Sequence, residues 1–461
     1  DYVSTQPLVT NYQAYIGTSA PISFNGLVRH YDLRRGDNVA DIQVNLVDKK
    51  DRSIQSHDIA KLMRGPIQVI AKRYNANVKI VEVPPGPPVL STLVAEIYGP
   101  DYKDQIKIAK QVKDIISKTK DVVDVDWMVE ADQPEYHIAV DKEKAMHYGV
   151  ATAQVAATVN AALSGLPSGN IYQPVAYHQT AIKLELSDSD KASLDDILDL
   201  KIANMQGNEI PIRDLVNVTR GIKQKNIYRK NQKEVVYILA DMAGKLESPS
   251  YAIANISDSL KNVKLPKGFS LKEEYTHQPE MQDNYSLKWD GEWQITYEVF
   301  RDLGIAFAVV ILLIYILIVG WFQNFTVPLV MLAAIPLSLI GIVLGHWALG
   351  AYFTATSMIG FIALAGVMVR NSVLLIDFIN IRLREGIPLK QAIIEAGAVR
   401  TTPILLTAGA VALGAVIILF DPIFQGLAIS LMGGTITSTF LTLLVVPLLY
   451  YRMMRKKYPT K

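Results

Sequence analysis

Cysteine is absent from this 461-residue sequence, so disulfide bonds and thiolate metal sites are excluded. Also absent are the glycine-rich lysine motif that cradles phosphates and the helical histidine motif of zinc proteases. The histidines that precede the apolar part are scattered without metal-ligand spacing, and we predict no metal site. No residue pair combines a nucleophile with a base, which makes a membrane enzyme such as an intramembrane hydrolase the weakest functional alternative.

Charge is absent from a long segment as well: no Asp, Glu, Lys or Arg occurs in 303–369. The formal net charge of +2 hides this division, because ten basic and four acidic residues follow Asp302 and leave the residues before 303 at −4. A slightly acidic part followed by an apolar part lacks the basic stripe that nucleic acid requires. We therefore predict a membrane protein that does not bind nucleic acid.

Five apolar stretches are long enough to cross a bilayer, which takes about 20 residues. They lie at about 303–321, 326–348, 353–380, 402–421 and 424–450, and a polar, aromatic-rich helix over 288–302 is predicted to lead into them. The connection 381–401 and the tail 452–461 contain most of the Lys and Arg of this part, so the positive-inside rule predicts a cytoplasmic position. Residues 1–301 are then periplasmic in a bacterium with two membranes. The basic tail is also suited to contact anionic membrane lipid.

A strand–helix–strand pattern occurs twice before the first span. Its elements are predicted at 93–98, 102–117 and 122–128, and again at 235–239, 250–263 and 269–274. Two such halves form a four-stranded, ferredoxin-like sheet with helices on one face. The segment between them, 132–221, is predicted to be an inserted subdomain, with a loop at 165–169 and an edge strand at 208–212.

Residues 1–89 are predicted to form a separate subdomain. The proline-rich run 84–88 closes it, because such a run enters neither a helix nor a central strand. Within it, the alternating stretch 41–47 predicts a strand, 56–74 has helical spacing, and 78–83 predicts a second strand.

The third span carries Arg370 near its middle and Asp377 seven residues later. A charge at the centre of a span is costly, so such residues face a bundle interior with a partner or a water path. Seven residues are two helical turns, so both side chains share a face at about 10 Å along the axis. With the amide of Asn371 nearby, we interpret them as a charge site whose partners change with protonation. The alternatives are a static ion pair for Arg370 and a solvated interface position for Asp377.

Arg400 and Thr407 repeat the seven-residue spacing in the fourth span. The alternative for Arg400 is an interface arginine whose charged end reaches water without a partner. In the last span, the small residues around Gly433 and Gly434 predict close helix packing.

Four stretches of the membrane part resemble resistance–nodulation–division (RND) efflux permeases of the hydrophobe/amphiphile type. They are VPLVMLAAIPLSLIG, LAGVMVRNSVLLIDF, VRTTPILLT and GGTITSTFLTLLVVPLLYY. The resemblance covers essentially the whole chain and implies an α+β membrane protein, with periplasmic ferredoxin-like porter and docking subdomains followed by a five-helix transmembrane half-bundle. It implies that 1–89 is the third porter subdomain without its opening elements, 90–131 with 222–287 the fourth, 132–221 the funnel or docking subdomain, and 303–451 the last five spans.

The resemblance also implies a proton relay. In similar pumps, residues that correspond to Arg370, Arg400 and Thr407 face two aspartates of the N-terminal half. Drug exporters usually have lysine at the position of Arg370, and arginine hardly deprotonates. The implied protein is an inner-membrane homotrimer that works with its N-terminal half, a periplasmic adaptor and an outer-membrane channel, driven by the proton-motive force without a cofactor. Because the chain begins with Asp and shows no signal peptide, we expect a fragment or one chain of a split pump.

The substrate is a small molecule in this interpretation. Drug pumps line a pocket with phenylalanines, and the matching stretch 11–20 has none, which favours a smaller or more polar substrate. Candidate pocket residues are Tyr12, Tyr15, Phe24 and Tyr31, with core packing as the alternative. Met63 and Met128 are poor evidence for the metal-exporting branch, which has glutamate rather than arginine in the tenth span. The main alternative is a non-transporting receptor or scaffold with the same fold, followed by a heavy-metal pump.

Overall fold

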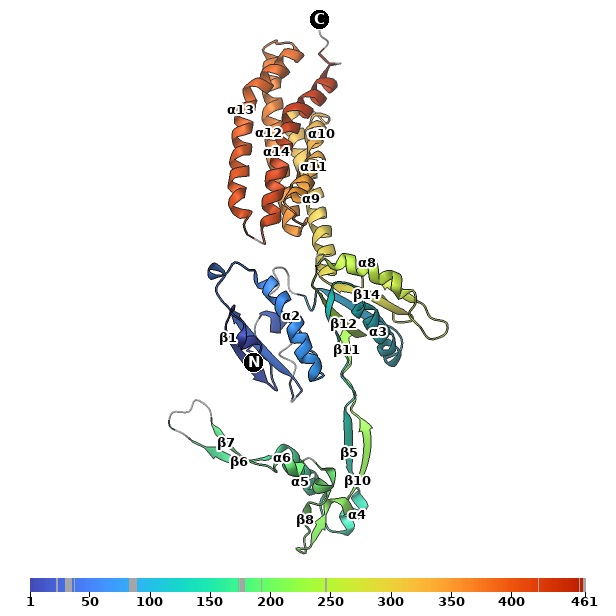
Figure 1. Ribbon diagram of the computed structural model, residues 1–461. Coiled ribbons are helices and arrows are strands. Elements are labelled where there is room, and N and C mark those ends of the chain that lie inside the picture. Colours follow the sequence, from blue (N-terminus) through green and yellow to red (C-terminus); the bar gives the residue numbers. More distant parts are fainter. Residues whose placement is uncertain are drawn as a thin grey trace. The chain divides into compact units, whose positions relative to one another are not determined.

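The computed structural model describes residues 1–461 apart from 22–23, 30–34, 37, 83–88, 173, 175–178, 192, 245–246, 422, 456 and 459–461. The side chains of Phe24, Asn25 and Val28, the candidate Tyr31 and the proline run 84–88 lie outside the described residues. The chain folds as two compact units (Figure 1). Unit 1 is Asp1–Met128 with Tyr228–Lys461, and unit 2 is Val129–Ile227. The predicted insertion 132–221 lies within unit 2.

Unit 1 contains a β-sheet built from two strand–helix–strand runs. The first is β3 (Leu93–Tyr98), α3 (Tyr102–Ser117) and β4 (Val122–Trp127), and the second is β12 (Lys233–Met242), α8 (Pro249–Leu260) and β13 (Leu271–Glu274). Helix α3 begins after Asp101, whose side chain accepts a hydrogen bond of 3.0 Å from the backbone N–H of Asp104. The apolar face of α3 packs on the sheet, and β3 is buried along its whole length.

The sheet has six strands instead of the predicted four. Its order is β11 (Tyr228–Lys230), β12, β3, β14 (Tyr285–Gly291) and β13, and β4 also pairs with β12. Strand β14 pairs antiparallel with β3 and parallel with β13. The helix predicted to begin at Lys288 therefore begins at Glu292. Lys288 lies opposite Glu96 of β3 and is buried there, so its charge marks a cross-strand ion pair and not an exposed helix.

The residues before 83 form a two-stranded sheet and two helices. These are β1 (Val9–Ile16), α1 (Phe24–Arg29), β2 (Ala40–Leu46) and α2 (Ser56–Arg73), with 3₁₀ turns at Val3–Thr5 and Lys49–Asp51. The described part of the predicted strand 78–83 joins no sheet. Instead, the backbone N–H of Ile80 donates to the Asp124 carboxylate on β4, and Arg64 of α2 pairs with the same carboxylate. This segment is therefore held to β4 by contacts with the Asp124 side chain and not by backbone hydrogen bonds between strands.

The described part of the chain contains five helical segments that are long and apolar enough to cross a membrane. They are α9 (Glu292–Phe322), α10 with α11 (Val327–Leu332 and Ala334–Ala348), α12 (Ala355–Arg384), α13 (Leu389–Ile418) and α14 (Gln425–Met454). The second segment breaks after Leu332 because Pro336, four residues later, has no N–H to donate to its carbonyl. The predicted connection 381–401 is mostly helix, and only 385–388 links α12 to α13.

Helix α14 approaches α11 closely at Gly341 and α12 closely at Gly434. A Cβ added to Gly341 would lie 2.5 Å from the Gly433 carbonyl oxygen, and one added to Gly434 would lie 2.2 Å from the Leu364 side chain. Glycine removes the side chain that would hold these backbones apart. Helix α14 therefore packs against α11, α12 and α13, as the small residues of the last span predict.

Unit 2 has a small core beneath a two-stranded ladder. Its elements are β5 (Pro134–Val140), α4 (Lys142–His147), α5 (Thr152–Ser164), β6 (Leu166–Ile171), β7 (Thr180–Leu184), α6 (Asp188–Lys191), α7 (Leu194–Leu198), β8 (Lys201–Ala203), β9 (Glu209–Pro211), a 3₁₀ turn (Ile212–Asp214) and β10 (Val216–Ile222). Strand β10 pairs with β5, and β9 pairs with β8. The predicted loop 165–169 is wrong, because residues 166–171 form an exposed strand that pairs with β7. Its proline, glycine and polar residues are typical of a loop, so the sequence does not indicate a strand.

Candidate functional site

Arg370 lies in the second half of α12 and is the only charged residue of that helix before Asp377. Its side chain is exposed, whereas the next residue, Asn371, is only 5% exposed. Within the described residues, Arg370 makes no hydrogen bond and no ion pair. The helices of this chain therefore bury the amide of Asn371 but leave the guanidinium on the surface of their bundle.

Asp377 lies two helical turns from Arg370 on α12 and is partly buried. In the part of the chain that the structure describes, its carboxylate has no ion-pair partner, and it forms none with Arg370. The static ion pair proposed as an alternative for Arg370 is therefore not formed with any described residue of this chain.

Arg400 is on the face of α13 that packs into the bundle. The residues at intervals of four along this face are Ala392, Ala396, Ile404 and Ala408, all of them buried. Arg400 is partly buried among them, and its guanidinium carbon lies 5.1 Å from the ring centre of Phe378 on α12. Its Nε atom is buried and has no hydrogen-bond partner among the described residues. Arg400 therefore contacts the neighbouring helix instead of only reaching outwards.

Thr407 lies two turns after Arg400 and is also partly buried. Its hydroxyl is 2.9 Å from the carbonyl oxygen of Ile404 and 3.1 Å from that of Pro403, and donates to this pair of acceptors on its own helix. The structure thus places Arg400 and Thr407 on one helix face, and within the described residues no hydrogen bond or ion pair joins them to Arg370.

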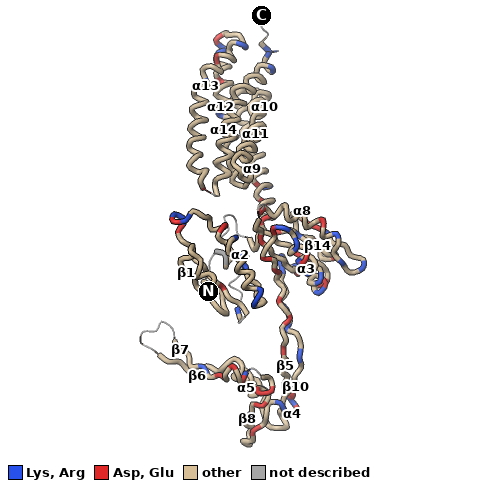
Figure 2. Tube along the Cα trace, in the orientation of Figure 1, with Lys and Arg blue, Asp and Glu red and all other residues tan. Residues whose placement is uncertain are grey.

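Sequence reasoning missed the contacts at the end of α12. Arg382 pairs with Glu385 at 2.7 Å and with Glu395 of α13 at 3.3 Å, and its guanidinium carbon lies 5.3 Å from the Phe378 ring centre. Figure 2 shows most of the bundle without charge and a group of charged residues where α12 meets α13. The spacing of four residues could have indicated that Phe378 and Arg382 are neighbours on one helix face. No local sequence pattern could have indicated that Arg400, on the next helix, contacts Phe378.

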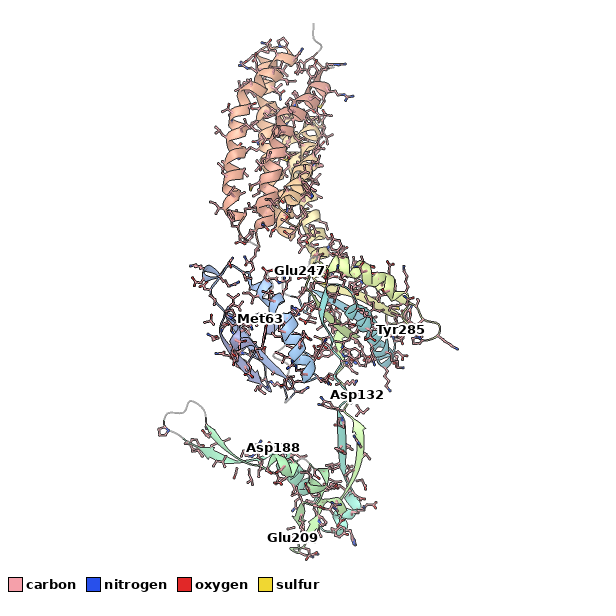
Figure 3. All side chains as sticks on the ribbon, in the orientation of Figure 1. Met63, Asp132, Asp188, Glu209, Glu247 and Tyr285 are labelled. Atoms are coloured by element: carbon pink, nitrogen blue, oxygen red, sulfur yellow. The ribbon has the colours of Figure 1, made fainter. Side chains whose placement is uncertain are left out.

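Of the candidate pocket residues, the structure describes the side chains of Tyr12 and Tyr15, and these two do not converge. Tyr12 and Tyr15 are three positions apart in the regular part of β1, so they lie on opposite faces of the strand. Tyr12 is 42% exposed, and the hydroxyl of Tyr15 donates to Gln13 at 2.8 Å. Met63 of α2 is buried (Figure 3), so its thioether is not at an open surface. Among the residues that the structure describes, no three His, Asp or Glu side chains are grouped so that they could hold a metal ion.

A second group of charges is buried in the sheet of unit 1. This ion cluster consists of Glu96, Lys230, Lys288 and Asp290, and the Tyr98 hydroxyl donates to Glu96 at 2.8 Å. Burial, together with a hydrogen bond to Asp290, raises the pKa of Glu96 to about 7. Burial also opposes ionisation of Asp290, but bonds from Glu96 and Lys230 outweigh it and lower the pKa of Asp290 to about 2. Of the two carboxyl groups, Glu96 is therefore the one that keeps a proton to higher pH.

His57 of α2 lies between two carboxylates of unit 1. Its Nδ1 atom is 3.1 Å from Glu82, and its Nε2 atom is 3.0 Å from Glu247, which Figure 3 labels. Burial lowers the pKa of His57, but the bond to Glu247 and the charge of Glu82 outweigh burial, so the pKa is raised. Because the two carboxylates face different ring nitrogens, they do not converge on one metal position, and the arrangement favours the doubly protonated ring.

The chain is similar to known membrane proteins along nearly its whole length. A profile of the AcrB/AcrD/AcrF family matches residues 16–454. The swarming motility protein SwrC of Bacillus subtilis (strain 168) is 28% identical over 372 residues, which are 79% of this chain and 33% of that protein. The nickel-cobalt-cadmium resistance protein NccA of Alcaligenes xylosoxydans xylosoxydans is 27% identical over 379 residues, which are 80% of this chain and 34% of that protein.

The fold agrees with a solved structure. The crystal structure of a heavy metal efflux pump (crystal form II) superposes with a TM-score of 0.73 at 20% identity and covers 98% of this chain and 44% of that one. The chain spans about a third of the length of the curated relatives it matches. Because the family profile covers nearly every residue and the five apolar helices follow a β-rich part, the chain belongs to the AcrB/AcrD/AcrF family of RND permeases.

Proposed function

We propose that this chain is the C-terminal half of a proton-driven exporter in a bacterial inner membrane. The observation that carries this proposal is Arg370, a permanent charge in the apolar helix α12 whose guanidinium the five spans of this chain leave exposed. A lipid-facing charge at that depth is costly. The surface around Arg370 is therefore proposed to face the N-terminal half of the permease.

In this proposal, Arg370 does not carry the proton. Proton binding changes which groups Arg370 contacts. Arginine keeps its own proton, so it acts by gripping an ionised carboxylate of the N-terminal half and releasing that carboxylate when it is protonated. Asp377 and Arg400 supply further charge along the same two helices, and Asn371 and Thr407 supply polar groups. The helices then shift, and residues 1–291 cycle between access, binding and extrusion on the periplasmic side.

The exported substrate is proposed to be a small organic molecule, and the complete pump to be a homotrimer with a periplasmic adaptor and an outer-membrane channel. Divalent metal export is the second candidate, because NccA and the solved pump carry metal names. Arg370 favours the organic substrate, because the metal-exporting branch has a glutamate where this chain has Arg370.

The test compares Arg370→Ala with Arg384→Ala, an exposed arginine at the end of the same helix. Each full-length protein is reconstituted in vesicles with an imposed proton gradient, and export of ethidium and of Ni²⁺ is measured. We expect Arg370→Ala to lower export about a hundredfold or more, with Arg384→Ala close to wild type and both variants folded. Wild-type export of ethidium alone supports the organic substrate, and of Ni²⁺ alone the metal.

The exporter proposal is overturned if Arg370→Ala exports as wild type does, or if the wild-type protein moves neither probe under the gradient.

A further inference from the structure

Phe378 of α12 lies close to two arginines, Arg382 of α12 and Arg400 of α13. The guanidinium carbon of Arg400 is 5.1 Å from its ring centre, and that of Arg382 is 5.3 Å away. Both distances are within the range in which the negative face of an aromatic ring attracts a cation, and this attraction is strongest where water is excluded. One aromatic ring thus contacts a cation from each of the two helices.

The ring itself is held in place. Phe378 is partly buried and packs against the apolar core of the helix bundle. Arg382, one turn further along α12, is held by Glu385 and by Glu395 of α13. The Phe378 ring and the Arg382 guanidinium are therefore held in place, and the ion pair between Arg382 and Glu395 attaches α13 to them.

Arg400 forms no hydrogen bond and no ion pair with the described residues. Its neighbours along the same face of α13, Ala396 and Ile404, are apolar, and Ala396 is small. A long flexible side chain in such surroundings has several rotamers available. The contact that the structure shows for its charged end is with the Phe378 ring.

An aromatic partner differs from a carboxylate in one important respect. A carboxylate would neutralise Arg400 and accept hydrogen bonds from its N–H groups. An aromatic face attracts the cation but leaves the charge in place and the N–H groups at the guanidinium edge free to donate. The ring can therefore orient the arginine without competing with another acceptor.

We propose that Phe378 is a positioning residue of the proton relay: its ring holds the Arg400 guanidinium so that the N–H groups remain available to a proton-dependent acceptor. The inference rests on the proposed function, because it needs Arg400 to act in proton-driven export. It adds a residue that is neither charged nor polar to that machinery.

The experiment changes the ring face with little change in volume. In the full-length protein, position 378 receives phenylalanine analogues with one, two and three ring fluorines, which weaken the negative face stepwise, and also Tyr and Leu. Ethidium export under an imposed proton gradient is measured, or Ni²⁺ export if that is the probe moved by the wild type. We expect a stepwise decline with fluorination, a decrease of about tenfold for Phe378→Leu, and near wild-type export for Phe378→Tyr.

Two controls separate ring charge from packing and from the function itself. Phe361→Leu makes the same change in a buried phenylalanine of α12 whose ring lies 4.9 Å from Phe307 and has no cation above it among the described residues; it should leave export within about twofold. Arg400→Ala tests the relay, and we expect it to abolish export.

The outcomes are distinct. If Arg400→Ala abolishes export while the fluorinated series is flat, the positioning role is wrong and the proposed function stands. If Phe378→Tyr and Phe378→Leu are equally impaired and fluorination has no effect, Phe378 is only a packing residue. If Arg370→Ala and Arg400→Ala both export normally, the proposed function falls, and this inference with it. The fluorinated series preserves ring shape, so it remains informative even if Phe378→Leu does not fold.

Discussion

The charged side chains in the sheet of unit 1 and those in the helix bundle differ in burial and in pairing. In the sheet, Glu96 and Lys288 are almost completely buried, yet they face each other across paired strands, and Lys230 and Asp290 complete the compensation. In the bundle, Arg370 is exposed and has no ion pair within the described residues. The ion cluster is self-contained, which is typical of a structural role, whereas Arg370 is available to a partner outside these helices.

The largest effect is expected from a substitution that removes one charge from the ion cluster in the sheet. Above about pH 7, where Glu96 is ionised, Lys288→Ala leaves the carboxylates of Glu96 and Asp290 with less countercharge, and we expect a loss of about 3–5 kcal/mol in the free energy of unfolding. Thermal unfolding of the full-length protein measures it. Lys272→Ala on β13 is the matched control, because that lysine is 71% exposed and its ion pair contributes little. Equal stability of the two variants would contradict a structural role for the cluster.

The pH dependence of the cluster sharpens the comparison. Because the pKa of Glu96 is raised from 4.5 to about 7, the folded state keeps a proton between these pH values that the unfolded state has released. Stability from this group is therefore highest below pH 4.5 and falls as pH rises through about 7, by at most about 3 kcal/mol. The lowered pKa of Asp290 acts below pH 3.8 and adds no slope in this window.

Unfolding temperatures at pH 5 and pH 7.5 measure this slope. Glu96→Gln is expected to remove most of the difference between them, since the amide does not titrate. Glu209→Gln in β9, where the carboxylate is 66% exposed, should leave the difference as in the wild type. A pH slope that survives in Glu96→Gln would show that another group causes it.

The smallest expected effect concerns helix packing in the bundle. Gly341→Ala places a methyl group 2.5 Å from the Gly433 carbonyl oxygen, so α11 and α14 must separate, and we expect a loss of about 1–3 kcal/mol. Gly366→Ala on α12 is the control, since an added Cβ there meets nothing within 4 Å. Thermal unfolding compares them, and unchanged stability of Gly341→Ala would show that the two helices can move apart without loss.

Much of the fold was predictable because it depends on local patterns. Apolar length indicates the five spans, and alternation and helical spacing indicate the two strand–helix–strand runs, with β3 and α3 at the predicted bounds. Strand β14 was missed for a physical reason. Its alternate residues Ser286, Lys288 and Asp290 are polar, and only pairing with β3 shows that this face is buried.

The amino-acid order alone places a permanent charge at Arg370 inside an apolar span, since the cost of that charge in a membrane does not depend on the rest of the fold. The partners of each charge were decided by tertiary structure. Strand register brings Lys288 to Glu96, and helix packing brings Arg400 to Phe378, 22 positions away in the sequence. Short-range patterns describe one element at a time, whereas these contacts form only when two elements meet.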